Sequence, residues 1–224
     1  MHQVKTRHRW ASLRGRTMGA LMGLGSGVLG VLAAMGASAQ VPAPLLEGVT
    51  EITAPGIPGP VSVVGSEAFC VVPCSSDGAQ AAAVAAGPAG KGRLVAWGHD
   101  GYLAKGALEV ADTGTLMLNT VRWAGRGDTP RVAVADAGEL ADYLAAKGLP
   151  VQRIRVRDLE SEMPQADVIC LNALHIGSAA QLEHLQAFLD AGGGIVTAAT
   201  GWGWIQLNPG HTANRDFFGN ALLV

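Results

Sequence analysis

The chain has 224 residues, of which 49% are hydrophobic and 15% are charged, and its formal net charge is −2. This length is sufficient for one domain with a substantial core. The chain has neither a strongly basic balance nor a basic stripe interleaved with aromatic residues, so we expect no nucleic-acid partner.

The first 39 residues resemble a secretory signal peptide. Basic residues lie at the start, an apolar run follows at 18–35, and Ala37-Ser38-Ala39 forms a small-x-small cleavage pattern. We therefore expect residues 1–39 to be removed on export to the periplasm or the medium, which leaves an acidic mature chain. The alternative is an uncleaved segment that anchors the chain in a membrane, and we expect no other membrane contact.

The next part of the chain contains short apolar runs separated by turn-forming residues. Residues 40–60 are rich in proline and glycine and predict an extended lead-in that does not pack as an element. The runs at 61–64 and 69–72 predict edge strands or a hairpin. Residues 79–89 are mostly alanine but contain a Gly-Pro pair, and they predict a strand.

From residue 93 onward, strand-like apolar segments alternate with amphipathic segments of helical period. The unbroken apolar run at 167–171 is typical of a central parallel strand, whereas 151–156 alternates and predicts a strand near an edge. Short connections favour βαβ units and a mostly parallel sheet with helices on both faces. We expect the first helix to be capped by Asp112, Thr113 or Thr115. The expected strands are 93–98, 131–135, 151–156, 167–171 and 195–200, and the expected helices are 115–124, 138–147 and 178–191.

The three cysteines allow several interpretations. Cys70 and Cys74 form either a disulfide-closed loop, a pair of free thiols, or part of a metal site that would need further ligands. Cys170 lies within the apolar run at 167–171, which predicts a buried and inert thiol.

The glycine-rich segment and the carboxyl end of the chain are informative in different ways. Gly192-Gly193-Gly194 follow a helix and precede a strand, so they predict a helix stop rather than a phosphate loop. Asn208-Pro209-Gly210 predicts a turn in which Gly210 has a positive φ. Residues 214–224 end on apolar side chains, which indicates either a docked last strand of a complete protein or a longer protein that has been cut.

Polar and aromatic side chains follow several expected strands at their carboxyl ends. These ends lie along one edge of a parallel sheet, where functional groups gather. Trp202 and Trp204 form either a stacking surface for sugar or peptide or a cap over the end of the sheet. The candidate binding rim consists of His99, Asp100, Asn172, His175, Thr200, Trp202 and Trp204.

Two enzymatic alternatives use residues at or near this rim. A cysteine hydrolase would pair Cys170 with His99 or His175, but a reactive thiolate needs an exposed, electropositive setting. A zinc hydrolase would draw ligands from His99, His175 and His211, but the chain has no H-E-x-x-H motif. We therefore expect no catalytic residue, no metal and no cofactor.

Four segments together resemble the amino-terminal module of TRP-channel-associated-factor proteins and of bacterial enhancin-type, mucin-directed metallopeptidases. They are GKGRLVAWGHDGYL (90–103), LMLNTVRWAG (116–125), LQAFLDAGGGIVTAATGWGW (185–204) and NPG (208–210). The resemblance implies a flavodoxin-like three-layer α/β sandwich of the class I glutamine-amidotransferase type, with a mostly parallel sheet, over residues 61–224.

The resemblance also implies a function. In a working amidotransferase of this class, a strand ends in a G-x-C-x-G nucleophile elbow, and here that position falls near Thr200, so the cysteine is absent and the glycine pattern is altered. This implies an exported, non-catalytic accessory module with a protein or glycan ligand. In the bacterial relatives a zinc peptidase domain follows, which here would lie outside this chain. The alternative is a hydrolase or transferase that uses Cys170 or Thr200.

Overall fold

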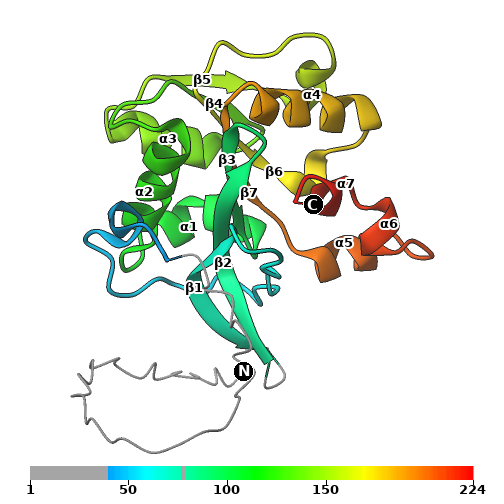
Figure 1. Ribbon diagram of the computed structural model, residues 1–224, viewed down its shortest axis with the longest axis horizontal. Helices are drawn as coiled ribbons and strands as arrows, with labels where there is room; N and C mark the ends of the chain where they lie inside the picture. Colours follow the sequence, from blue (N-terminus) through cyan, green and yellow to red (C-terminus); the bar gives the residue numbers. More distant parts are fainter. Residues whose placement is uncertain (1–39, 77–78, 224) are drawn as a thin grey trace, which may run out of the picture. The chain divides into compact units, whose positions relative to one another are not determined.

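The computed structural model describes residues 40–76 and 79–223 (Figure 1). The expected signal peptide lies outside these residues and stays a prediction. The strands are β1 (Phe69–Ser76), β2 (Ala79–Ala89), β3 (Gly92–Trp97), β4 (Val132–Ala135), β5 (Val151–Ile154), β6 (Val168–Asn172) and β7 (Gly194–Ala198). The α-helices are α1 (Lys105–Leu108), α2 (Thr113–Gly125), α3 (Gly138–Ala146), α4 (Ala179–Asp190), α5 (Gly201–Leu207), α6 (Ala213–Asp216) and α7 (Phe218–Ala221). Short 3-10 turns are η1 (Ala43–Leu46), η2 (Asp100–Leu103), η3 (Val156–Glu160) and η4 (Ala173–His175).

The strands form a seven-stranded sheet in the order β1-β2-β3-β7-β6-β4-β5. The pairs β1–β2 and β2–β3 are antiparallel, and the other four pairs are parallel. The order β5-β4-β6-β7 corresponds to the 2-1-3-4 part of a flavodoxin-like sheet. The prediction of an α/β fold with a mostly parallel sheet is therefore confirmed, as are the central position of β6 and the edge position of β5.

Helices cover both faces of the sheet, and each face has its own core (Figure 1). On one face, α2 and α3 bury residues such as Met117, Val121 and Leu144. These positions are the ones that the helical spacing predicts. On the other face, α4 buries Leu185 against strand residues such as Ile195. Because alternate residues of β4, β6 and β7 enter opposite cores, these strands are mostly apolar. The exceptions are Asn172 at the end of β6 and the buried Thr197 in β7.

The amino-terminal segment packs onto the fold, which differs from the expected unpacked lead-in. Leu45 of η1 is fully buried in the same core as α2. The carboxylate of Asp112 accepts hydrogen bonds from the backbone N–H groups of Thr50 and Glu51, at 2.8 and 3.2 Å. These bonds lower the pKa of the Asp112 carboxyl. Asp112 is the N-cap residue of α2, which is one of the three predicted, but its side chain makes no capping hydrogen bond to the helix.

One further prediction is corrected in the segment before β1, and one of two alternatives is set aside at the carboxyl end of the described chain. Residues 61–64 do not form a strand, and only Val61 makes an isolated bridge, with Ala82 of β2. The strand that pairs with β2 is instead β1, which runs beyond the predicted 69–72. The carboxyl-terminal segment contains α6 and α7 rather than a docked last strand. Among the residues described, no helix is long and apolar enough to cross a membrane.

Glycines set the spacing between the sheet and its helices at several points. Gly192 has φ +103° just after α4, which confirms the predicted helix stop. Gly210 also has a positive φ, of 88°, as the sequence predicts. Gly194 begins β7, and a Cβ atom added there would lie 2.5 Å from the carbonyl oxygen of Ala124 in α2. The close approach of α2 to the middle of the sheet therefore requires a residue without a side chain.

The Gly194→Ala variant should be less stable than the native chain by about 1–3 kcal/mol, because the added methyl group meets rigid helix backbone. Gly106→Ala is the matched control, since nothing lies within 4 Å of a Cβ atom at Gly106 in α1. Urea unfolding followed by circular dichroism measures both. Equal stability of Gly194→Ala and the native chain would show that α2 does not pack this closely.

Candidate functional site

Three neighbouring parallel strands deliver the candidate rim. In register, Trp97 at the end of β3 pairs with Ala198 at the end of β7, and Ala198 pairs with Asn172 at the end of β6. The residues that follow these ends, including His99 and Thr200, therefore lie along one edge of the sheet. Whether these residues bind a ligand stays a prediction, but their shared position follows from the strand order.

Thr200 joins β7 to α5, which is the strand-to-helix connection of an elbow. Its side chain is only 4% exposed. Its backbone angles, φ −116° and ψ 114°, are ordinary extended values. A nucleophile elbow holds its reactive side chain free on a strained turn. The connection at Thr200 therefore has the topology of an elbow without the strain and exposure of a working one.

His99 is positioned by its own turn rather than by a catalytic partner. Its Nδ1 atom accepts a hydrogen bond from the backbone N–H of Gly101 at 2.8 Å, and this bond begins η2. The same Nδ1 atom lies 3.3 Å from Asp100 Oδ1. A nitrogen that accepts the amide proton has no proton to donate to the carboxylate. The His99–Asp100 contact is therefore not the oriented pair that a general base requires.

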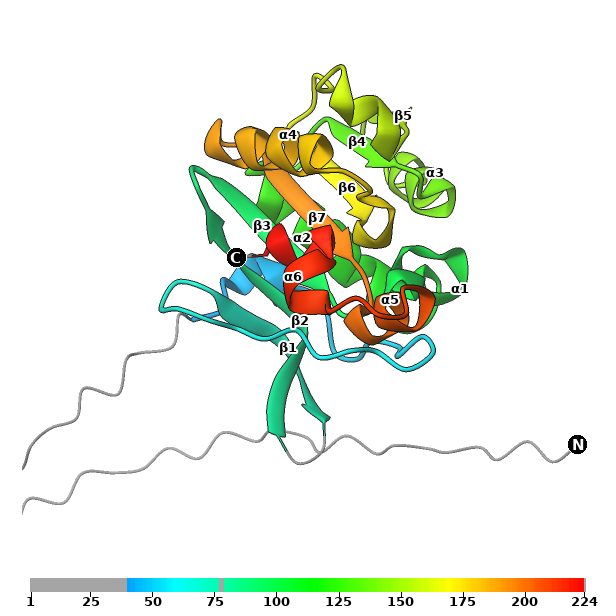
Figure 2. The same cartoon turned by 90° about the vertical axis from the view of Figure 1, so that its right-hand side faces the viewer.

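Residues 55–61, which we call the rim strap, lie across this edge of the sheet (Figure 2). The strap is the last part of the expected lead-in and contacts His99, Trp202 and Gly98. The Ile57 carbonyl accepts a hydrogen bond from Trp202 Nε1 at 3.2 Å. The Gly59 N–H donates to the Gly98 carbonyl at 2.7 Å. A Cβ atom at Gly56, where φ is +58°, would lie 2.8 Å from His99 Nε2. The strap therefore occupies the space above His99 and beside Trp202.

Trp202 and Trp204 do not form the joint stacking surface considered from the sequence. They lie two positions apart on α5, and such residues point to different sides of a helix. Trp202 is 41% exposed and contacts the strap. Trp204 is half-buried and stacks on Phe217, with ring centroids 5.1 Å apart and an interplanar angle of 24°.

Trp204 lines a hollow between η4 and the last three helices, which we call the α5–α7 hollow. Its volume is about 280 Å³. The residues that line it include Leu174, Trp204, Leu207, Asn208, Asp216 and Phe218. Since η4 follows β6 and α5 follows β7, the hollow adjoins the same sheet edge as the strap.

The remaining rim residues serve local structure or face solvent. Asn172 Oδ1 accepts a hydrogen bond from the Leu174 N–H at 3.0 Å and so begins η4. His175, at the end of η4, is exposed. Asp136, which follows β4 and is not part of the candidate rim, likewise serves local structure, since its carboxylate accepts a hydrogen bond from the Val156 N–H at 2.9 Å.

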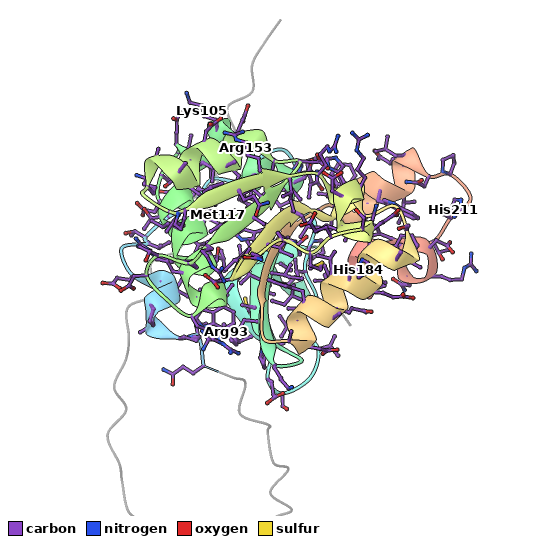
Figure 3. All side chains as sticks on the ribbon, turned by 90° about the horizontal axis from the view of Figure 1, so that it is seen from above. Arg93, Lys105, Met117, Arg153, His184 and His211 are labelled. Carbon is purple, nitrogen blue, oxygen red and sulfur yellow. The ribbon has the colours of Figure 1, made fainter. Side chains whose placement is uncertain are left out.

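The zinc alternative receives no geometric support. His211 lies in the loop between α5 and α6 (Figure 3). Within the described ranges, no three His, Cys, Asp or Glu side chains are close enough together to hold a metal ion.

Trp123, near the end of α2, lies far from this edge, beside the amino end of β3. Its ring contacts the Arg93 guanidinium, whose carbon lies 4.8 Å from the ring centroid, and Figure 3 labels Arg93. Phe69 meets the same ring edge-on at 5.8 Å. Trp123 is therefore a packing residue of the core rather than a binding platform.

The three cysteines are free thiols in different settings. Cys70 and Cys74 lie four positions apart on β1, and an extended strand places such residues about 13 Å apart, which is too far for a disulfide. Burial raises the pKa of both thiols. Cys170 in β6 is fully buried, and burial raises the pKa of its thiol far more strongly. The predicted inert thiol at Cys170 therefore fits the structure.

Sequence reasoning missed the strap and the hollow. Pro-Gly-rich residues 55–61 carry no periodic signal, because their contacts use backbone atoms and the absence of side chains at glycine. Asn208 and Asp216 lie on either side of the turn at Gly210, and only the spacing from Thr212 to Asp216 marks the start of a helix there. The Thr212 N–H donates to Asp216 Oδ2 at 2.8 Å.

Replacing Gly98 with alanine should detach the rim strap, because the new Cβ atom would lie 2.1 Å from the Gly59 carbonyl oxygen. Gly201→Ala is the control at the same edge, since nothing lies within 4 Å of a Cβ atom there. In hydrogen–deuterium exchange, the Gly59 and Val61 amides should exchange about ten-fold faster in Gly98→Ala only. Unchanged exchange would mean that the strap is not held by Gly98.

Native thiol labelling should separate the three cysteines. Iodoacetamide should modify the half-buried Cys70 and Cys74 slowly and leave Cys170 unmodified until the chain is unfolded, since the thiolate is the reactive form. Peptide mass spectrometry after timed labelling measures each site. Rapid labelling of Cys170 in the folded protein would contradict its buried position.

Comparison with known proteins places the fold in a family. The family described as "TRPM8, N-terminal domain" matches residues 35–224. TRPM8 channel-associated factor 2 of Bos taurus is 33% identical, and that of Homo sapiens is 32% identical, each over 182 residues. Both alignments cover 80% of this chain and 18% of the relative, so the chain spans less than a fifth of either relative's length.

Solved structures of a bacterial peptidase share the fold. The structure of IMPa from Pseudomonas aeruginosa in complex with an O-glycopeptide has a TM-score of 0.53 and 17% identity, and the match covers 70% of this chain and 19% of that chain. A second, described as IMPa metallopeptidase from Pseudomonas aeruginosa, has a TM-score of 0.51. The resemblance seen in the sequence is thus confirmed by the family match, by the relatives and by the fold. The chain belongs to the TRPM8 channel-associated factor N-terminal domain family.

Proposed function

We propose that this chain is an exported, non-catalytic amidotransferase-like domain that binds glycoprotein as an accessory module of a longer, peptidase-type protein. The observation that carries the proposal is the elbow at Thr200. Its side chain is buried, its backbone is unstrained, and a hydroxyl stands where a working amidotransferase has a thiol. Nucleophilic catalysis needs an accessible nucleophile with a base in hydrogen-bond reach.

The strap supports the same conclusion. A substrate bound for attack at the elbow would approach the carboxyl edge of β7, where the strap contacts Trp202 and Gly98. His99 is the candidate base that follows β3, the strand next to β7. Its Nδ1 atom already accepts a hydrogen bond from the Gly101 N–H within its own turn. In this proposal, the residues at the elbow position and the strap together form a closed edge of the sheet.

A binding role is favoured by the surface around α5. Trp202 and Ile205 are exposed apolar side chains three positions apart on this helix, and Ile57 of the strap, which contacts Trp202, is exposed as well. Exposed apolar side chains that cluster in this way mark interaction surfaces more often than single exposed residues do. The solved relative is described in complex with an O-glycopeptide. Glycoprotein is therefore the ligand class that we propose here.

Two measurements on residues 40–224 test this proposal. Calorimetry with a synthetic O-glycopeptide should give measurable heat of binding, and incubation with glutamine, ester and peptide substrates should give no turnover above buffer. Turnover that disappears in Thr200→Val or in Cys170→Ala would instead establish the hydrolase or transferase alternative. Absence of any binding to the glycopeptide would remove the binding role.

Export is part of the proposal and has a separate test. The full chain, expressed in a bacterium with a periplasm, should be recovered from the periplasmic fraction with Gln40 as its first residue. Amino-terminal sequencing of the recovered protein identifies that residue. Recovery of the intact chain from the cytoplasm alone would contradict the signal peptide.

A further inference from the structure

The α5–α7 hollow combines an aromatic wall with hydrogen-bond acceptors. Two contacts hold Trp204 in place, one to its ring and one to its backbone. Its ring stacks on Phe217, and its backbone carbonyl accepts a hydrogen bond from Asn208 Nδ2 at 2.8 Å. His211 meets the Trp204 ring edge-on at 6.0 Å. The indole is thus fixed in orientation before any ligand arrives, which limits the entropy lost on binding.

The acceptors belong to Asn208 and Asp216. Asn208 uses its Nδ2 group for Trp204, and its Oδ1 atom makes no hydrogen bond to another described residue. Asp216 accepts hydrogen bonds from Arg215 Nε at 2.9 Å and from the Thr212 N–H at 2.8 Å. These contacts, first of all the one with Arg215, lower the pKa of the Asp216 carboxyl. The carboxylate therefore stays ionised at neutral pH. Its Oδ2 atom already accepts from the Thr212 N–H and from Arg215 Nη2, whereas among the described residues its Oδ1 atom accepts only from Arg215 Nε and can accept a further bond.

The charges around the hollow favour a neutral ligand. Asp216 is the ionised side chain that lines it. The Arg215 guanidinium is already engaged by both Asp216 oxygens. His211 Nδ1 also lies 3.6 Å from Asp216 Oδ2. The basic groups beside the hollow therefore already face this carboxylate, and an anionic ligand would meet its negative charge. A ligand with several hydroxyl donors and an apolar face matches the surface better.

We infer that the α5–α7 hollow binds a neutral sugar unit of an O-linked glycan. A sugar ring places its C–H face against the Trp204 and Leu207 side chains and donates hydroxyl hydrogen bonds to Asn208 and Asp216. The volume of about 280 Å³ lies near the lower end of small-molecule sites, about 300–1,000 Å³, which suits a small ligand. This inference rests on the proposed glycoprotein binding and assigns it to one site.

One pair of variants on the same helix tests the assignment. Leu207 is 78% exposed and lines the hollow, whereas Ile205 is 44% exposed and does not line it. Leu207→Arg places a long charged side chain across the hollow without disturbing the core. Ile205→Arg makes the same chemical change on another side of α5, away from the hollow. Circular dichroism confirms that both variants fold.

The probe is a synthetic peptide that carries a neutral O-linked disaccharide, studied by calorimetry. Its Kd should increase at least ten-fold in Leu207→Arg and change less than two-fold in Ile205→Arg. The same peptide without sugar, and the same glycopeptide with a terminal sialic acid, should each bind the native domain at least ten-fold more weakly.

The outcomes separate this inference from the proposed function. If the glycopeptide binds the native domain and Leu207→Arg equally well, the hollow is not the site, although the binding role stands. If the sugar-free or sialylated peptide binds as tightly as the neutral glycopeptide, a neutral sugar is not the ligand of the hollow. If the native domain binds no glycopeptide, both the function and the site are wrong.

Discussion

The position of β7 between β3 and β6 is the constraint on which the rest of the site depends. In-register pairing brings the ends of three parallel strands to one level. Gly194 allows α2 to approach the start of β7 closely, and the other face of the sheet is covered by α4. Because both faces of the sheet are covered, the chain continues from the carboxyl end of β7 along the edge of the sheet, where Thr200 and α5 lie.

This edge is divided between two structures with different chemistry. Over β3 and β7, the strap closes the edge with backbone hydrogen bonds and with glycines that fit against Gly98 and His99. Over β7 and β6, the short helices after α5 leave a hollow lined by Trp204 and Asp216. The flavodoxin-like part of the sheet thus ends in an edge that the strap covers over β3 and β7, and the hollow lies beside it.

Much of the sheet could be predicted from the sequence, because its strands are buried on both faces. The unbroken apolar run of β6 indicates a central strand, and the helical spacing of Leu140 and Leu144 in α3 indicates which side faces the core. Even the alanine-rich β2 could be recognised from its Gly-Pro pair. Each of these patterns lies within one segment of the chain, and it arises because the buried positions of that segment must be apolar.

The site itself depends on contacts that leave no such pattern. The side chain of Asp112, the N-cap residue of α2, bonds residues 50–51 and not the helix. Ile57 contacts Trp202 across 145 positions of sequence. Such contacts use backbone atoms, which every residue carries, so the residue types do not reveal them. The separation of Trp202 from Trp204 follows only once α5 is known to begin at Gly201.

The accessibility of position 200 is the most direct test of the account. A Thr200→Cys variant, made in a Cys70→Ser and Cys74→Ser background, restores the thiol of a working elbow, and buried Cys170 serves as the internal standard. The account predicts that iodoacetamide labels position 200 only after unfolding, together with Cys170, and that the variant hydrolyses no glutamine. Rapid labelling of position 200 in the folded protein, with glutamine turnover, would show that the elbow is open and would contradict the proposed closed, non-catalytic edge.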